Sequence, residues 1–188
     1  LDLRWSGGDH VQLAVDRGAT AIHINGDQAE TLLARHQFER VAEIVQWTKE
    51  QKRIAGVSAH DLEVLRQCEK LKLEVDFYQK TLHTLDYYSA PRPNETGPKG
   101  DHDNSWCNDP GAVIEFMAAN RKPWIAFKIL AAGALLPLQA FPHAFNSGAD
   151  FILVGMFDWQ IPENARMASR LVNRLQKSNS PRARPWCA

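Results

Sequence analysis

Short apolar runs with a period of two alternate along this chain with longer segments whose apolar residues repeat every three or four positions. The first pattern is typical of strands and the second of amphipathic helices. Strands are predicted at residues 1–5, 19–24, 53–58, 73–81, 123–130 and 150–156. Helices are predicted at residues 9–17, 38–49, 62–71, 110–120, 136–146 and 163–176. Six β-α units in alternation indicate a parallel sheet covered by helices.

The predicted ends of these segments carry recognisable signals. Asp61 and Asp109 each precede a helix and are predicted to cap it, and Asp27 is most simply explained in the same way. Residues 84–109 contain three prolines and two glycines among many Asp and Asn, so they are predicted to form a long loop.

Two architectures fit a parallel sheet covered by helices, the doubly wound sheet and the (β/α)8 TIM barrel. No strand is followed by a GxGxxG or GxxxxGK[ST] phosphate loop. Polar residues follow several different strands, which favours a barrel mouth over a single crevice. A complete barrel has eight strands, so six units predict an incomplete barrel that lacks two N-terminal units of roughly 60 residues. The barrel is assigned residues 1–178 and a C-terminal tail residues 179–188.

Composition narrows the class of partner. The chain has 188 residues, and its 22 basic residues balance 22 acidic ones, which argues against nucleic acid or an anionic membrane as partner. No apolar run approaches the roughly 20 residues of a membrane span. Three cysteines without a CxxC pair fit a reducing compartment such as the cytoplasm. A small molecule is therefore the expected substrate.

Candidate chemistry follows from the side-chain alternation in the predicted strands. In residues 73–83, Val75 and Phe77 alternate with Asp76, Tyr78 and Lys80, which predicts one apolar face and one chemical face. In a barrel, the same parity directs a set of polar residues inward to one mouth, with Asp158 just past the last strand. That set is His23, Ser58, His60, Lys80, His83 and Lys128.

The first mechanism that fits this set uses the two lysines. Burying an ammonium group is costly unless it is paired or used, so Lys80 and Lys128 are candidate catalytic residues together with His23. Lys80 would form a Schiff base with a carbonyl substrate, and Lys128 would lower the pKa of Lys80 by repulsion between like charges. The structural alternative is a salt bridge from a lysine to Asp76 or Asp158.

The second mechanism uses a divalent metal held by His60, His83 and Asp158, with a lysine stabilising negative charge. A non-catalytic barrel that binds a small polar ligand is the third class. In each case the predicted substrate contacts come from two strands and the loop before residue 110. These contacts are Ser58, Tyr78, Trp106 and Cys107, and Cys107 is also weighed as a nucleophile or ligand.

Four segments carry a resemblance to a known family: AGVSAH at 55–60, WIAFKILAAG at 124–133, GADFILVGM at 148–156 and EN at 163–164. They resemble the C-terminal three-quarters of a bacterial TIM-barrel family distantly similar to the aldo/keto reductases. The resemblance implies a barrel, NADP as cofactor, His23 on the strand of the catalytic histidine, and the strands of Lys128 and Gly155 along the cofactor.

The sequence departs from that family at important positions. The catalytic Asp and Tyr would lie in the missing units, and the catalytic Lys belongs on the strand at residues 1–5, where no Lys occurs. The lysine pair is also similar in strand position to that of deoxyribose-phosphate-type class I aldolases, a likeness at the level of the fold. The predicted function is therefore lyase- or isomerase-type chemistry on a small polar carbonyl or sugar-like substrate, with reduction of a carbonyl as the alternative.

Overall fold

The computed structural model describes residues 7–90 and 106–175. In these residues five strands form one all-parallel sheet in the order β1-β2-β3-β4-β5, accompanied by seven α-helices. The chain divides into two compact units, residues 1–79 and residues 80–188, and the division falls within β3. Within the described ranges, every helix is too short or too polar to cross a membrane.

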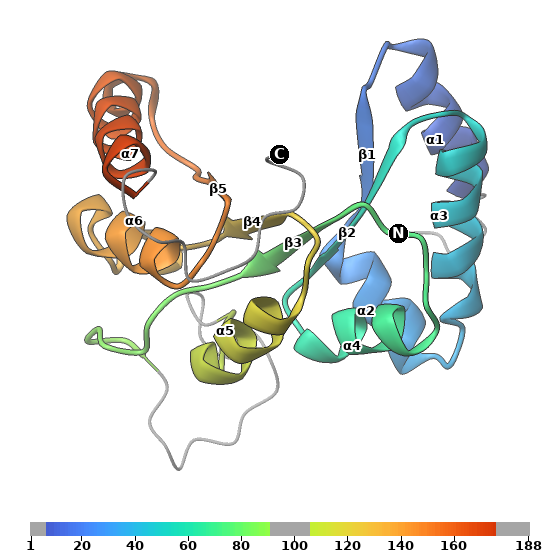
Figure 1. Ribbon diagram of the computed structural model, residues 1–188, viewed down its shortest axis with the longest axis horizontal. Helices are drawn as coiled ribbons and strands as arrows, with labels where there is room; N and C mark the ends of the chain where they lie inside the picture. The colour runs from blue at the N-terminus through green and yellow to red at the C-terminus, as the bar shows by residue number, and fades with distance from the viewer. Residues whose placement is uncertain (1–6, 91–105, 176–188) are drawn as a thin grey trace. The chain divides into compact units, whose positions relative to one another are not determined.

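The first unit packs its helices around the parallel pair β1 and β2, as Figure 1 shows. Its elements are α1 (Gly7–Asp16), β1 (Ala21–Ile24), α2 (Gly26–Ala34), α3 (Glu39–Glu50), β2 (Ile54–Ala59), α4 (Leu62–Lys70) and the start of β3 (Phe77–Thr81). The register pairs Ala21 with Ile54 and Ile24 with Val57. Its core contains Val41, Val45, Val57, Val64 and Leu65, all buried.

Helices α2, α3 and α4 end in the same way. The second residue after each helix has a positive φ, namely 56° at His36, 55° at Lys52 and 53° at Lys72. The following backbone N–H reaches back to a carbonyl of the last turn, as in the bond from Leu73 N to Cys68 O at 3.0 Å. This left-handed closure satisfies carbonyl groups that the helix leaves open, although Gly is the usual residue there. Gly18 and Gly148 close α1 and α6 in this way.

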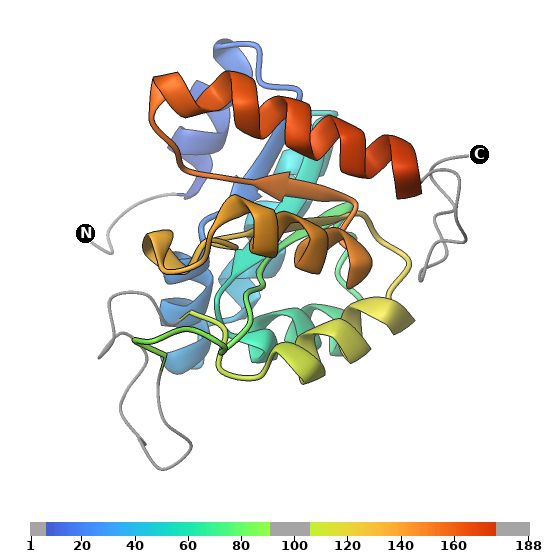
Figure 2. The ribbon, with the colours of Figure 1, turned by 90° about the vertical axis from the view of Figure 1, so that its left-hand side faces the viewer.

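The second unit contains the rest of β3 and the parallel pair β4 and β5, whose register pairs Ile125 with Phe151. Its other elements are α5 (Pro110–Ala119), β4 (Trp124–Phe127), a 3-10 turn (Ala131–Gly133), α6 (Pro137–Asn146), β5 (Phe151–Leu153), a 3-10 turn (Asp158–Gln160) and α7 (Ile161–Leu175). Figure 2 shows α7 running beside β5, with α6 next to both. Met117, Trp124, Ile129 and Phe141 form its core.

The predicted alternation of strands and helices is confirmed for the described residues, with one helix missed. The short helix α2 follows β1 directly, so two helices rather than one separate β1 from β2. Its start was readable, because Asn25 caps it by accepting a hydrogen bond from the N–H of Asp27 at 2.9 Å. The caps at Asp61 and Asp109 are confirmed. The predicted strand at residues 1–5 and the tail at 179–188 lie outside the described residues.

The two predicted faces of β3 exist, but their predicted directions are reversed. A Cβ placed on Gly56 would lie 2.2 Å from the Phe77 ring, and His23 contacts that ring edge to face. Phe77 therefore shares the face of His23 and Gly56, while Tyr78 on the other face donates to Glu69 of α4 at 2.6 Å. Alternation places Lys80 on the Tyr78 face. The ring fits where it does because Gly56 has no side chain, which a reading of β3 alone cannot reveal.

Candidate functional site

The carboxyl end of β3 holds Trp106 by its backbone. The hydroxyl of Thr81 donates to the carbonyl of Trp106 at 2.9 Å, and the N–H of Trp106 donates to Nε2 of His83 at 3.1 Å. Thr81 and His83 are almost fully buried. Thr81 and His83 thus engage both backbone polar groups of one residue and hold the backbone of Trp106 in place.

His83 is neutral in this arrangement. Its Nδ1 lies 2.9 Å from the carbonyl of Thr84, so Nδ1 carries the proton and Nε2 accepts from Trp106. Burial lowers the pKa of His83, helped by the positive charge of Lys80 and by His143, while the carbonyl of Thr84 acts in the opposite direction. Since both ring nitrogens are engaged, a metal could bind His83 only by displacing one of these bonds.

Lys80 lies in the interior, with 1% of its surface exposed. Its Nζ donates to the hydroxyl of Thr81 at 2.6 Å and lies 3.3 Å from the Thr81 carbonyl. The carbonyl of Lys80 accepts from Nε1 of Trp124 at 3.4 Å. A chain of hydrogen bonds therefore runs from the Lys80 ammonium through Thr81 to Trp106. The contacts of Lys80 fit a residue that positions Trp106.

Lys128 contacts the indole of Trp106 and lies just past β4. Its Nζ is 3.9 Å from the centroid of the Trp106 ring, within the range of a cation–π interaction. Lys128 and Trp106 both line a cavity of about 600 Å³, whose walls come from the segments after β4 and β5 and from α7. Of the two predicted lysines, Lys128 is the one whose side chain borders this cavity.

The backbone after β4 is strained. Lys128, Ala131 and Ala132 have φ values of 55°, 44° and 54°, in a region that costs an L-residue roughly 1 kcal/mol or more. Elsewhere in the described residues, non-glycine positions with such values close a helix, whereas these three follow a strand. Strain of this kind concentrates at functional sites. Lys128, Ala132 and Gly133 line the cavity, so the strain makes this cavity a candidate functional site.

Most of the cavity lining is apolar, and a few polar groups border it. Asn164, buried at the start of α7, donates to Sδ of Met156 at 3.5 Å, and the side-chain oxygen of Gln160 accepts from the N–H of Phe157 at 2.9 Å. Both residues line the cavity with Lys128. An apolar cavity with few polar groups is typical of a small-molecule site. Sequence reasoning missed Gln160 as a lining residue.

Cys107 is buried beside the same strand end. Burial raises the pKa of its thiol. Lys80 and a backbone hydrogen bond with His83 lower this pKa to a smaller extent, and Asp109 raises it. The thiolate is the nucleophilic form of cysteine. A buried thiol with a raised pKa fits a structural role for Cys107 better than a nucleophilic one.

The first unit brings together a different set at the carboxyl ends of β1 and β2. Nδ1 of His60 lies 3.4 Å from Oε1 of Glu30 and 3.6 Å from Oδ1 of Asp27. Glu30 also accepts from the backbone N–H of His60 and of Asp61, both at 2.6 Å. Ligand atoms of the three side chains lie within 4.8 Å of one another, a spacing that a divalent metal could bridge.

His60 therefore lies beside Asp27 and Glu30, whereas the sequence predicted a metal site shared with His83 and Asp158. The predicted metal set of His60, His83 and Asp158 is divided between the two units, and Asp158 is exposed at the start of a 3-10 turn. Sequence reasoning assigned Asp27 only a capping role. That prediction is wrong, because Asn25 caps α2 and the carboxylate of Asp27 lies 3.6 Å from Nδ1 of His60.

The remaining predicted residues have structural contacts. His23 is exposed and lies against Phe77, with ring centroids 6.5 Å apart. Ser58 is buried and accepts from Nε2 of Gln79 at 3.3 Å. Tyr78 is fully buried against α4, and burial, reinforced by Cys68 and Glu69, raises the pKa of its hydroxyl. Among the described residues, the cavity beside Lys128 gathers two of the predicted residues, Trp106 and Lys128.

Compared with known proteins, the chain matches no protein-family model and no curated protein sequence.

Proposed function

We propose that the parallel sheet belongs to a (β/α)8 barrel and that the protein is an enzyme acting on a small carbonyl compound. The barrel is supported by the all-parallel order and by β5, which ends the sheet with Phe151 and Leu153 half exposed. A parallel strand with apolar side chains is normally covered on both faces. In a barrel, a further strand would pair with this edge.

The observation that carries the function is the Lys128 amine at the cavity. It is held above the Trp106 ring, on a strained backbone, at the carboxyl end of a parallel strand where barrel enzymes place their chemistry. The ammonium first releases a proton to solvent. The free amine then attacks a carbonyl carbon, forming a C–N bond while the carbonyl oxygen takes up a proton, which gives a carbinolamine. Loss of water then gives a Schiff base, which withdraws electrons from the neighbouring C–C or C–H bond.

The proposed roles differ from those expected from the sequence. Lys128 is the nucleophile, and Lys80, Thr81 and His83 are positioning residues that hold Trp106 beneath it. The mostly apolar lining favours a short carbonyl compound over a sugar, because a sugar would leave many hydroxyl groups without partners. Lyase-type cleavage or isomerisation next to the carbonyl follows from Schiff-base chemistry.

Reductive trapping tests this proposal. The full chain is incubated separately with acetaldehyde, acetone and pyruvate, treated with borohydride, and digested for mass spectrometry. We expect an adduct on Lys128 with at least one compound, and its loss in Lys128→Met. Lys122→Met, which removes a lysine from the turn before β4, is the matched control and should keep the adduct. An adduct on Lys80 would restore the assignment expected from the sequence, and uniform surface labelling would refute the proposal.

A second candidate is NADP-dependent carbonyl reduction. Lys128 and Gly155 line the same cavity, and the resemblance to aldo/keto reductases implies that their strands would lie along the cofactor. This candidate predicts that NADPH quenches the fluorescence of Trp106 and that Trp106→Phe removes the change. Oxidation of NADPH that depends on an added carbonyl compound would favour reduction over Schiff-base chemistry.

Metal-assisted chemistry is a third candidate, supported by the cluster of Asp27, Glu30 and His60. Titration with Mn²⁺ or Zn²⁺ in a calorimeter tests it. Binding that is lost in His60→Ala and kept in His10→Ala, an exposed histidine of α1, would favour it. Equal binding by both variants would remove it.

A further inference from the structure

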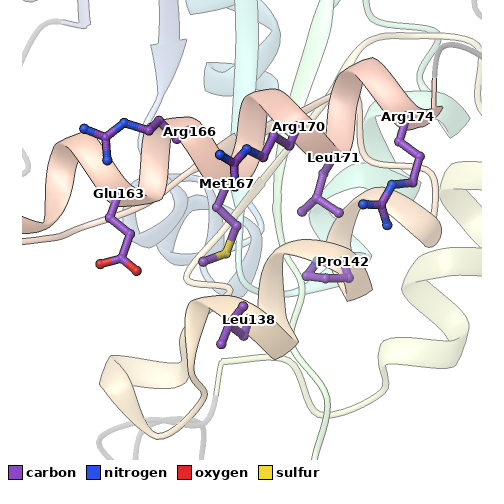
Figure 3. A pocket seen from close by; sticks show the side chains of 8 residues that line it. All are labelled: Leu138, Pro142, Glu163, Arg166, Met167, Arg170, Leu171 and Arg174. Atoms are coloured by element: carbon purple, nitrogen blue, oxygen red, sulfur yellow. The ribbon is translucent and has the colours of Figure 1, made fainter.

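A second cavity of about 560 Å³ lies between α6 and α7 and shares no lining residue with the Lys128 cavity. Leu138 and Pro142 of α6 line one wall, and Met167 and Leu171 of α7 line the other. Figure 3 shows Met167 and Leu171 pointing toward α6. We call this cavity the α6–α7 groove.

The apolar surface of the groove is incompletely covered. Leu138 is 71% exposed although it lies on the side of α6 that borders α7. Two helices packed ridge into groove would bury a leucine at such a place. Contiguous exposed apolar surface with a polar rim is a mark of an interaction site.

The rim of the groove carries three arginines. Arg166, Arg170 and Arg174 follow one another at every fourth residue of α7, so they share one side of the helix and span about 12 Å. All three are exposed. Within the part of the chain that the structure describes, none of them forms an ion pair. Glu163 lies at the other end of the rim, one turn before Arg166.

We propose that the α6–α7 groove binds an acidic amphipathic helix of a partner protein. The apolar side chains of such a helix fill the space over Leu138, Met167 and Leu171. Its carboxylates, repeated at every third or fourth residue, meet the arginines, whose planar guanidinium groups match carboxylates well. A basic residue at one end of the partner helix meets Glu163 and fixes the direction of binding.

The spacing of the three arginines along the rim favours an acidic helix over a fatty acid or a nucleic acid as the ligand of the groove. A fatty acid carries one carboxylate and engages a single arginine, whereas the rim offers three along its length. A nucleic acid would match the arginines but would have no use for an apolar floor. A helix places charges and apolar groups on adjacent faces at the same period as α7.

Fluorescence anisotropy with designed peptides tests the proposal on the full chain. The probe is a labelled, end-capped helical peptide of about 15 residues with Leu and Glu on adjacent faces and Lys at one end. A basic version with Glu replaced by Lys, and a scrambled version, are the comparison peptides. We expect the acidic helix to bind at least tenfold more tightly than either, and its affinity to fall as salt is raised.

Charge-reversal variants locate the binding. Arg170→Glu should weaken binding of the acidic peptide about tenfold, since several favourable charge contacts become repulsive. Leu138→Asp should weaken it by a similar factor. Arg40→Glu, on an exposed position of α3, is the matched control and should change little, and circular dichroism of each variant checks folding.

Three results would overturn the proposal. One is equal affinity for the acidic, basic and scrambled peptides. Another is Arg170-dependent binding to vesicles of anionic phospholipid with no binding of the acidic peptide, which would make the groove a lipid site. The last is self-association in sedimentation that Arg170→Glu abolishes, which would make the occupant a second copy of the chain. The test is independent of the proposed enzyme activity.

Discussion

In each unit, an aspartate links the amino ends of two neighbouring parallel strands. The two units differ at the carboxyl ends of their strands. In the first unit the N–H of Asp76 donates to the carbonyl of Ala55 at 2.8 Å, and its carboxylate accepts from the N–H of Ala55 at 2.8 Å. In the second unit Asp150 makes the same two bonds with Trp124, at 3.0 and 2.8 Å. Each aspartate clamps the start of one strand to the start of its neighbour.

The carboxyl ends of the strands carry different groups. The first unit places a histidine between two carboxylates there, and its positive φ angles lie at helix ends. The second unit places Lys128 above Trp106, on a strained backbone beside a cavity. The amino ends of parallel strands therefore serve stability in both units, and the carboxyl ends differ in chemistry.

The largest expected difference between the two units is in how tightly side chains pack against a glycine of each unit. Gly56→Ala in the first unit would place a Cβ 2.2 Å from the rigid ring of Phe77. We expect a loss of about 3 kcal/mol in the free energy of unfolding, measured by urea denaturation. Gly155→Ala in the second unit is the matched control, because a Cβ there meets nothing within 4 Å. Equal effects would show that the two regions are packed alike.

Removing the charge of each clamp tests whether the two are equivalent. Asp76→Asn and Asp150→Asn should each lower stability by about 1–2 kcal/mol, because an amide is a weaker acceptor for the backbone N–H. Asp76 also accepts from Lys49 at 2.7 Å, but both side chains are about one-third exposed, so solvent limits that contribution. Asp158→Asn, at an exposed site, should change little. A large effect at only one clamp would break the equivalence.

The second unit should be the acid-sensitive one. The pKa values of His83 and His143 are both lowered by burial from 6.5, so the unfolded chain binds more protons than the folded chain. Their contribution to stability is fully present above pH 6.5 and is lost as the pH falls below it. Urea denaturation across this range should show stability rising with pH, with a smaller slope in His83→Gln. An unchanged slope in that variant and in His143→Gln would contradict the assignment.

Relief of backbone strain gives the smallest expected effect. Lys72→Gly at the end of α4 and Ala132→Gly after β4 both replace a residue whose φ is near 54°. Each should raise stability by up to about 1 kcal/mol, since glycine adopts this region without a steric penalty. The contrast between the units predicts that activity changes only in Ala132→Gly. Loss of stability in both variants would show that neither backbone is strained.

Several features of this protein are determined by its sequence. Periodicity located the five described strands and six of the seven helices, because side-chain alternation and helical spacing are properties of a few neighbouring residues. Caps at Asp61 and Asp109 follow from the same local chemistry. Polar residues after several strands pointed to the carboxyl edge of the sheet, and Lys128 and Trp106 lie there together.

Tertiary structure decided which residues meet. Phe77 takes the face of β3 that faces Gly56, which reverses the expected direction of Lys80, because space over a neighbouring strand outweighs the alternation of apolar and polar residues. His60 lies with Asp27 and Glu30, both far from it in sequence. Trp106 is fixed by Thr81 and His83 across a long loop. These contacts join residues about 20 or more positions apart, so a pattern confined to neighbouring residues carries no record of them.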